Sequence, residues 1–430
     1  MQRIDGENWL RLQLAARSYT QLRHAALHFG SATALLEQDP DELYESKIIY
    51  KKTAERLKEV RSDKTKKLVD ETVELCRRNG WRIITPQSPY YPKELLKLSR
   101  FPFVLYALGD PELLKAKTKC SIVGTRASTQ NARVIGYKLG YALSLSGAVV
   151  VSGGALGVDA ASHEGALAGS TGTIAVLGAG LAGKYLKQNE DLRKRIASNG
   201  LLITEMNPFE GATKFNFPER NRIIAMLGDA CCVIESKISG GSLITADIAY
   251  ENKKPIFVPS FFINPSPGCR KLAAEKGAIQ FEKPAEILQY ISSNRGEVCD
   301  VESLPKEALR TVGPDYNVDF ALPGLKSFIL GKEDTQTERS SLNGSNNSGS
   351  SAEKNKDGGE KPDFLSALPV SETERIVLRA LSDKPLAVDK IVEKTRLGAD
   401  EVVSSLTLLE LRGTVKSYYG NSYSLNIDPA

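Results

Sequence analysis

Three loops in this chain combine glycines with hydroxyl or basic residues directly after short apolar runs. The sequence "IVGTR" closes one run with Gly124, Thr125 and Arg126, and "VVVSGGALG" closes the next with Gly153 and Gly154. A third loop, "ESKISGGSLIT", contributes Ser239, Gly240, Gly241, Ser242 and Thr245. Where no Cβ intervenes, backbone N–H groups at a helix N-terminus can approach an anion closely. Three such loops favour a phosphate-binding edge, although each alone would also suit a tight turn.

A further segment, "KFNFPERNR", surrounds an aromatic ring with polar and charged side chains. The candidate residues are Lys214, Phe217, Arg220, Asn221 and Arg222. The proline after the ring suits the first turn of a helix, which would direct Phe217 to the mouth of a site. Cations alternating with an aromatic suit a single-stranded nucleic acid, because its phosphates pair with cations and its unstacked bases need a ring face. The alternative is a hydrophobic staple at Phe217 and structural ion pairs at the arginines.

The segment "GAGLAG", residues 178–183, fits the glycine pattern of a dinucleotide site, and Glu205 lies where a ribose-binding acid would be needed. However, these glycines follow the third apolar run of the series instead of the first. The next helix is also predicted to begin only near Asn189, so the third glycine would not lie at its N-terminus. The pattern therefore disfavours NAD(P) or FAD, and we predict no cofactor.

Candidates for catalysis and metal binding are few. His24 and His28 lie one turn apart in the N-terminal region, and His163 follows Asp159 by four residues, a spacing that suits a helix brace or an acid–base pair. No serine elbow, Walker lysine or set of metal ligands is present. We interpret the six cysteines as reduced core thiols: Cys76, Cys120, Cys231, Cys232, Cys269 and Cys299. A binding protein without catalytic residues or a metal is favoured over an enzyme.

The elements that would position these residues are short apolar strands separated by helical stretches. The strand candidates are "CSIVGT", "AVVVSGG", "GTIAVLGAG", "GLLITEM", "ACCVIES", "KPIFVPS" and "AIQF". Nearly continuous apolar runs indicate strands buried on both faces, which predicts a doubly wound α/β domain with a mostly parallel sheet. Ligands of such domains bind beyond the carboxyl ends of the strands. Arg126 ends its strand, so its guanidinium should project over that edge, unless it forms a surface ion pair.

A length of 430 residues predicts two or three domains. We expect a helical domain over 1–75, of a SAM or helix-hairpin-helix kind, and an α/β core over 76–300 that includes the segment leading into it. Residues 301–364 are expected to form a flexible low-complexity linker, and 365–430 a winged helix with Gly420-Asn421 at its hairpin turn. The net charge of +5 permits an anionic partner without requiring one. No apolar run approaches the roughly 18 residues that span a bilayer, so we expect a cytoplasmic protein.

With these motifs established, the chain resembles the bacterial DNA-processing protein A family (DprA, also called Smf). The resemblance covers residues 80–282, roughly, and more weakly the helical N-terminus and the winged helix. The motifs that carry it are "IITPQSPYYPKELLKLSRFPFVLYALGDPELL", "SIVGTRAST", "SGGALGVDAASHEGAL", "TIAVLGAG", "FPERNRIIA", "SGGSLITADIA" and "EKGAIQF". It implies an extended Rossmann-like core that binds single-stranded DNA in a positive pocket, protects it, and loads the RecA recombinase during natural transformation. Homodimers, RecA and single-strand-binding protein are the implied partners, with no membrane.

The resemblance also assigns roles to single residues. Arg126 and Lys214 would hold phosphates, and Phe217 would contact a base. The run Arg220-Asn221-Arg222 would line the pocket, while Gly124 and the loop from Ser239 to Ser242 would donate backbone N–H groups. Three loop positions differ from the family pattern: Leu186 replaces a proline, Ser260 replaces a glycine, and Arg270 replaces an asparagine.

Two other functions fit parts of the pattern. An α/β enzyme acting on a nucleotide or nucleoside phosphate would bind a small ligand, whereas a strand-binding protein engaging about four cations should show a salt slope of about −3. A duplex-reading winged helix is the other alternative. Its presumed recognition helix, "ADEVVSSLTLLELRG", is acidic at its start, which suits protein contact better than a phosphate-lined groove.

Overall fold

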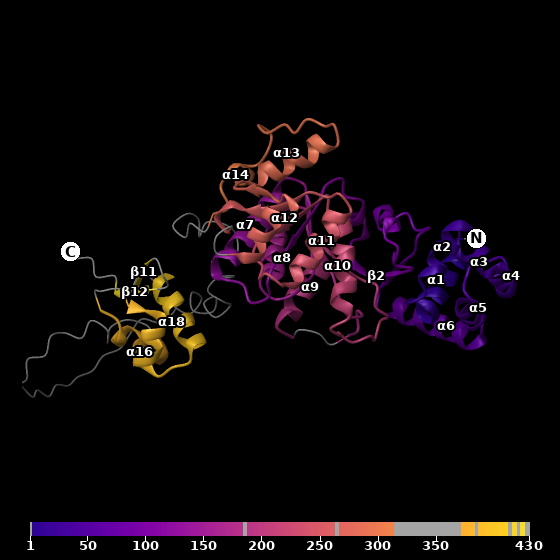
Figure 1. Ribbon diagram of the computed structural model, residues 1–430, viewed down its shortest axis with the longest axis horizontal. Coiled ribbons are helices and arrows are strands. Elements are labelled where there is room, and N and C mark those ends of the chain that lie inside the picture. The colour runs from indigo at the N-terminus through magenta and orange to yellow at the C-terminus, as the bar shows by residue number, and fades with distance from the viewer. Residues whose placement is uncertain are drawn as a thin grey trace, which may run out of the picture. The chain divides into compact units, whose positions relative to one another are not determined.

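The structure is a computed structural model that describes residues 2–183, 187–262, 266–313, 371–382, 386–411, 415–418 and 422–425 (Figure 1). The chain divides into two compact units, residues 1–342 and 343–430. Leu186, the predicted Gly420-Asn421 turn and most of the predicted linker lie outside the described residues. None of the helices within the described residues is long and apolar enough to cross a membrane.

The first unit is built on a nine-stranded sheet of order β1-β2-β6-β5-β4-β3-β7-β8-β9. The strands are β1 (Arg82–Ile84), β2 (Leu105–Gly109), β3 (Lys119–Val123), β4 (Val149–Ser152), β5 (Thr173–Val176), β6 (Leu201–Thr204), β7 (Ala230–Val233), β8 (Ile256–Pro259) and β9 (Ile279–Phe281). Strands β3 to β9 pair in parallel, and β1 and β2 add an antiparallel edge. The predicted mostly parallel sheet is confirmed, and each of the seven apolar runs forms a strand.

The strand order reverses at β3. From β3 the chain proceeds through β4, β5 and β6 in one direction, and then returns to place β7 on the other side of β3. In register, Val123 at the end of β3 lies opposite Val233 at the end of β7. The loops that leave these two strands therefore diverge, which opens a crevice at their carboxyl ends, where open α/β sheets bind ligands.

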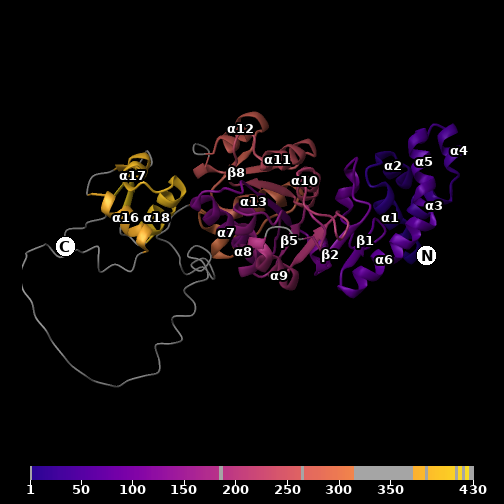
Figure 2. The same cartoon turned by 90° about the horizontal axis from the view of Figure 1, so that it is seen from below.

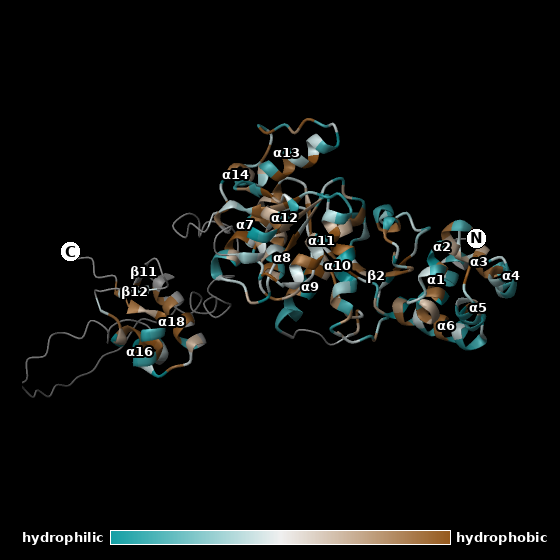
Figure 3. Cartoon of the chain, viewed as in Figure 1, coloured by the Kyte–Doolittle hydropathy of each residue, from teal (hydrophilic) through white to brown (hydrophobic). Residues whose placement is uncertain are grey.

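Helices cover both faces of the sheet (Figure 2). On one face lie α10 (Asn216–Leu227), α11 (Gly241–Glu251) and α12 (Pro267–Lys276), packed on strand side chains such as Val151 and Val233. The other face carries α7 (Gln130–Leu145), α8 (Val158–Ala168), α9 (Glu190–Asn199) and α13 (Pro284–Asn294). Short 3-10 helices span Lys93–Lys97, Pro111–Lys115, Lys187–Asn189 and Ser260–Phe262. Many helices alternate hydrophobic and hydrophilic residues, as one buried face requires (Figure 3).

Six helices lie between residues 2 and 78: α1 (Gln2–Ala16), α2 (Thr20–His28), α3 (Ala32–Glu37), α4 (Pro40–Glu45), α5 (Lys51–Val60) and α6 (Asp63–Arg78). Ser31, Asp39 and Ser62 cap three of them through side-chain oxygens that accept backbone N–H groups. Their core includes Trp9 and continues into Phe101 and Phe103, just before β2. The helices therefore share one core with the edge of the sheet, and the boundary predicted near residue 75 falls inside α6.

The core extends past the predicted start of the linker at residue 301. Helix α14 (Lys306–Leu309) follows α13, and the side chains of Ala308 and Val312 are fully buried. Val312 also donates its backbone N–H to the carbonyl of Glu282 at 2.9 Å. Residues 301–313 therefore belong to the folded α/β unit instead of the linker.

The second unit is a winged helix, as predicted. It contains α16 (Glu372–Ala380), α17 (Val388–Thr395) and α18 (Ala399–Leu411), with a sheet of order β10-β12-β11 formed by β10 (Leu386–Ala387), β12 (Ser422–Leu425) and β11 (Val415–Tyr418). Val377, Ile391 and Leu406 form its fully buried centre. Ser371 and Glu374 close a capping box at the start of α16.

Candidate functional site

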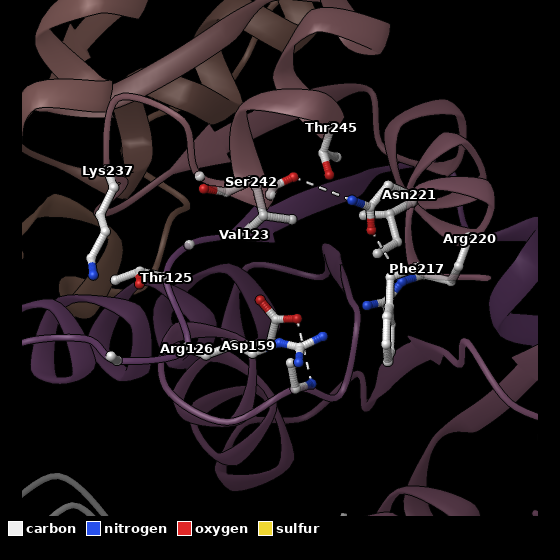
Figure 4. A pocket seen from close by; sticks show the side chains of 16 residues that line it. Val123, Thr125, Arg126, Asp159, Phe217, Arg220, Asn221, Lys237, Ser242 and Thr245 are labelled. Atoms are coloured by element: carbon white, nitrogen blue, oxygen red, sulfur yellow. Dashed lines mark hydrogen bonds between the residues drawn. The ribbon is translucent and has the colours of Figure 1, made fainter. Parts of the chain in front are cut away.

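A cavity of about 410 Å³ lies at the switch point, between the exit loops of β3 and β7 (Figure 4). Sixteen residues line it, from the end and exit loop of β3, the loop before α8 and its first turn, α10, the exit loop of β7 and the start of α11. The predicted site residues among them are Gly124, Thr125, Arg126, Phe217, Arg220, Asn221, Gly240, Gly241, Ser242 and Thr245. Segments more than 100 residues apart in the sequence thus meet at one sheet edge.

The exit loop of β3 holds Arg126 out toward solvent. Gly124 is required here, because a Cβ at this position would lie 2.6 Å from the Val158 side chain. Thr125 donates its backbone N–H to the Glu235 carbonyl at 2.8 Å, which ties this loop to the end of β7. The guanidinium carbon of Arg126 lies 4.6 Å from the centre of the Phe217 ring, a cation–π contact. Within the described residues no carboxylate forms an ion pair with Arg126, so its charge is free for a ligand.

Phe217 stands in the first turn of α10, followed by Pro218 as the sequence predicted. The ring is half-buried and packs on the strand-exit segment, where a Cβ at Gly178 would be 3.0 Å from it. The ring therefore packs on Gly178, the Arg126 guanidinium lies over it, and the residue lines the cavity. A base that stacks on this ring would therefore take the place of the Arg126 guanidinium over it.

Arg220 lines the cavity, but its guanidinium is hydrogen-bonded to other groups of the protein. Its guanidinium donates to the carbonyls of Gly153 and Val176, and its Nε donates to Asn221 Oδ1 at 3.2 Å. Asn221 in turn donates to the Gly241 carbonyl at 3.2 Å. These bonds join α10 to the ends of β4 and β5 and to the start of α11. Arg220 and Asn221 therefore build the cavity as well as line it.

Gly153 and Gly154 are not among the residues that line the cavity, but they pack behind those residues. A Cβ on Gly153 would overlap the Arg220 guanidinium and would lie 2.6 Å from Asp159 Oδ2. Gly154 adopts φ +64°, a left-handed conformation that side chains disfavour. The two glycines therefore make room for Arg220 and turn the chain, which differs from the phosphate contact that the sequence suggested.

The start of α11 presents backbone N–H groups to the cavity. Gly240 is the N-cap residue, and in the described residues neither Gly241 nor Ser242 has an acceptor for its backbone N–H. Space around Gly241 is open, since no atom lies within 4 Å of where its Cβ would be. The Ser242 hydroxyl donates to Ser236 Oγ at 2.8 Å, and Ser239 is exposed outside the lining. A helix N-terminus of this kind attracts an anion through its unpaired donors and its dipole.

Two lining residues were missed by the sequence reasoning. Lys237 is exposed at the cavity and has no ion-pair partner in the part of the chain that the structure describes. A lysine in the loop that follows a strand, three residues before a Gly-Gly pair, could have revealed it. Asp159 is buried, and burial raises the pKa of its carboxyl, an effect opposed by Arg220 and by the Ala155 N–H at 3.4 Å. Its carboxylate balances the buried charge of Arg220.

The expected hydrogen bond between Asp159 and His163 is replaced by other contacts. His163 Nδ1 lies 2.8 Å from Thr173 Oγ1 on the neighbouring strand. Burial, together with the nearby Arg220 charge, lowers the pKa of His163 to about 3, so the ring is neutral at physiological pH. His163 is fully buried and does not line the cavity. Within the described residues, no three His, Cys, Asp or Glu side chains gather as metal ligands.

Lys214 and Arg222, two predicted contacts, lie outside the lining. Lys214 is exposed before α10, with its Nζ 5.2 Å from the centre of the Phe215 ring. Arg222 is buried and forms an ion pair with Glu205, so the structural alternative holds for this arginine. Glu205, which the dinucleotide pattern would use for a ribose, is bound instead to Arg222 and lies 3.7 Å from the Arg23 guanidinium. Arg222 is therefore corrected from a pocket residue to a buried structural one.

Of the positions that differ from the family pattern, Ser260 and Arg270 are described by the structure, and neither lines the cavity. The hydroxyl of Ser260 donates to Glu282 at 3.2 Å, and Arg270 is an exposed residue of α12. All six cysteines are free thiols, and five of them are buried, with the Cys120 and Cys232 sulfurs 3.5 Å apart. Neither group alters the charge of the cavity.

The fold and the cavity define a doubly wound α/β protein with a cavity lined by cations and a helix N-terminus at its switch point, and with a separate winged helix. Residues 82–292 match the family model described as DNA recombination-mediator protein A, and residues 361–421 match the DprA winged helix domain. The chain belongs to the DNA recombination-mediator protein A (DprA/Smf) family.

Relatives extend this match. The chain is 31% identical over 351 residues to Protein Smf of Synechocystis, covering 80% of this chain and 79% of that protein. It is 34% identical over 216 residues to DNA processing protein DprA of Bacillus subtilis, covering 50% and 73%. The X-ray structure of DprA from Streptococcus pneumoniae aligns with a TM-score of 0.56 at 29% identity, over 65% of this chain and 96% of that one. The predicted family and α/β fold are thereby confirmed.

Proposed function

We propose that this chain is a single-stranded-DNA-binding recombination mediator that protects incoming strands and loads RecA onto them during natural transformation. The observation that carries the proposal is the switch-point cavity, which is lined by Arg126, Lys237, the start of α11 and the ring of Phe217. The cations and N–H groups suit phosphates, and the ring suits a base.

The presence of Phe217 favours a single strand over a duplex. A ring can stack on a base only if that base is not already stacked on its neighbours. Unstacking a base costs free energy in a duplex and much less in a single strand. Lys214, outside the cavity, is a further unpaired cation among the described residues and would bind a phosphate beyond the first nucleotide. A ligand longer than one nucleotide therefore suits the charges better than a nucleoside phosphate.

The remaining parts of the proposal follow from the family. We expect a cytoplasmic homodimer with RecA and single-strand-binding protein as partners. We also propose that the cavity binds DNA without catalysing a reaction, since Asp159 is engaged by Ala155 and His163 lies outside the lining. The winged helix is assigned to protein contact, because α18 begins with the acidic pair Asp400-Glu401.

Fluorescence anisotropy with labelled oligo-dT, matched duplex and mononucleotide tests the binding proposal. Three unpaired cations, Arg126, Lys214 and Lys237, predict a single-strand salt slope of about −2, shallower than the value of about −3 expected when buried arginines are counted. Arg126→Ala should weaken single-strand binding about tenfold or more and reduce the slope by about 0.7. Lys66→Ala, which removes an exposed cation of α6, serves as the matched control.

The outcomes separate the two functions. Preferential binding of the single strand that weakens in Arg126→Ala supports the mediator. Binding of mononucleotide alone would move the function to a nucleotide enzyme, and strand binding indifferent to Arg126→Ala would move the DNA to another surface. RecA loading is then measured as RecA-dependent strand exchange on DNA pre-coated with single-strand-binding protein, with and without this protein.

A further inference from the structure

Two large aromatic rings stand in solvent just before α10. Phe209 is 75% exposed and Phe215 is 72% exposed, both within residues 207–216, which we call the rim segment. Single exposed apolar side chains are common on protein surfaces, but here two phenylalanines of one ten-residue segment are both presented to solvent. The surrounding contacts decide whether this surface is held in place and what it suits.

The rim segment is anchored at both its ends. Both guanidinium nitrogens of Arg17, on α1, donate to the Glu210 carboxylate at 2.7 and 2.9 Å. Asn216 donates its side-chain amide to the same carboxylate at 3.1 Å. The exit segment of β5 contributes two backbone bonds, from Gly180 to the Glu210 carbonyl at 2.8 Å and from Ala182 to the Pro208 carbonyl at 3.0 Å. The two rings are therefore carried on a backbone that is already ordered, which lowers the entropy cost of binding.

The rim segment is continuous with the cavity. Gly178, at the exit of β5, lies against Phe217 in the cavity wall. Gly180, two residues later, packs so closely on the segment that a Cβ there would overlap the carbonyls of Asn207 and Pro208. Two residues of extended chain span about 7 Å. A strand that leaves the cavity past Phe217 thus reaches the rim segment within a short distance.

The charges around the rim segment favour an anionic partner. Each nearby acid has a basic partner: Glu205 pairs with Arg222, Glu210 with Arg17, and Glu219 with Arg100 at 2.8 Å. Lys214 forms no ion pair within the described residues, and its Nζ lies 5.2 Å from the Phe215 ring. The exposed surface is therefore aromatic and positively charged, the combination that suits single-stranded nucleic acid.

We propose that the rim segment is a second contact site for single-stranded DNA, in which Phe209 and Phe215 stack on bases outside the cavity while Lys214 holds the phosphate between them. This inference rests on the proposed function. It predicts that affinity depends on strand length beyond the few nucleotides that the cavity accommodates, and that the added affinity comes from the two rings.

The test compares a short oligo-dT of about four nucleotides with a long one of about 20 nucleotides. The short strand has about the length of the smallest known single-strand binding sites. The Phe209→Ala/Phe215→Ala double variant should bind the long strand about tenfold to a hundredfold more weakly and the short strand within about twofold of the wild type. Phe215→Tyr, which keeps a ring, should restore most of the affinity lost in Phe215→Ala. Tyr50→Ala is the matched control, because Tyr50 is also 75% exposed but lies in the N-terminal helices.

Tryptophan fluorescence can test directly whether bases lie against the rim segment. In Phe215→Trp, the introduced indole should be quenched by the long oligo-dT and not by the short one. Trp9 is only 1% exposed, so its emission should respond little to the ligand. The same titration on the wild-type protein gives the background from Trp9 and Trp81.

The results distinguish this inference from the proposed function. If the wild type binds no single strand, both fail together. If the wild type binds and Arg126→Ala weakens binding, but the double variant binds both lengths as the wild type does, the rim inference alone is wrong. A change in oligomeric state by light scattering, with unchanged DNA affinity, would instead make the rim a protein contact. Unchanged melting temperatures exclude misfolding as the cause.

Discussion

The floor of the cavity and the exposed cations in and beside it use the same residue types for opposite purposes. In the floor, which we define as Gly153, Asp159 and Arg220, the guanidinium is buried and bonded to carbonyls near a buried carboxylate. Arg126, Lys214 and Lys237 are exposed and form no ion pair within the described residues. A buried charge that the protein has already neutralised adds little affinity and destabilises the fold when it is removed, whereas an exposed charge can add affinity and contributes little stability.

The largest expected effect is on the floor. Arg220→Ala should lower the free energy of unfolding by about 3 kcal/mol or more, because it leaves two carbonyls without their donor and the buried Asp159 without its countercharge. Urea unfolding followed by circular dichroism measures it, with Arg126→Ala as the control that should change stability by less than about 0.5 kcal/mol. A variant that keeps its stability but loses DNA affinity would instead place Arg220 among the ligand-binding cations.

The next effect is the pH dependence of the buried His163. The unfolded chain protonates this residue below about pH 6.5, whereas the folded chain keeps it neutral down to a pKa of about 3. The unfolded state therefore binds more protons in this window, and stability falls as the pH drops, by about 2 kcal/mol between pH 6.5 and pH 5. Urea unfolding across this range should show that slope reduced in His163→Gln. Equal slopes in both proteins would mean that other groups cause the acid sensitivity.

A smaller effect is expected at Lys237, the cation that sequence reasoning missed. Lys237→Ala should weaken single-strand binding about threefold to tenfold and make the salt slope shallower by about 0.7, with no change in stability. Anisotropy titrations at several salt concentrations give both quantities. An unchanged slope would remove Lys237 from the phosphate contacts and leave Arg126 and the start of α11 to hold the anion.

The smallest effect concerns the ion pair that anchors the rim segment. Arg17 and Glu210 are partly exposed, at 31% and 24%, so Arg17→Glu should cost about 0.5–1 kcal/mol of stability. We expect a two- to threefold loss of affinity for a long strand and none for a short one. The double variant Arg17→Glu/Glu210→Arg should recover part of both losses, because it restores the ion pair but an arginine at position 210 cannot accept the Asn216 amide. Equal losses of affinity for both strand lengths, or no recovery in the double variant, would mean that the Arg17–Glu210 ion pair does not act on DNA binding through the rim segment.

The candidate site could be predicted from sequence where the residues follow strands directly. The positions of Gly124, Arg126 and the Gly240-Gly241 pair were predictable, because parallel strands place their carboxyl ends at one edge. The sequence did not predict that Arg126 is exposed whereas Arg222 is buried in an ion pair. The identity of a residue does not reveal which acidic side chains the fold brings near it. Asp159 was likewise assigned to His163 by spacing, although Ala155 and Arg220 are its neighbours in the structure.

The sequence by itself determined the strands, the winged helix and the family, because apolar runs and glycine-rich loops are local patterns that dictate local structure. It also determined the types of residue that line the cavity: cations, an aromatic ring and small residues at a helix start. Only the tertiary structure decided which of these residues are free to bind. Burial and pairing with Glu205 or with backbone carbonyls depend on segments far apart in the chain, and they separate the residues that build the cavity from those that face solvent.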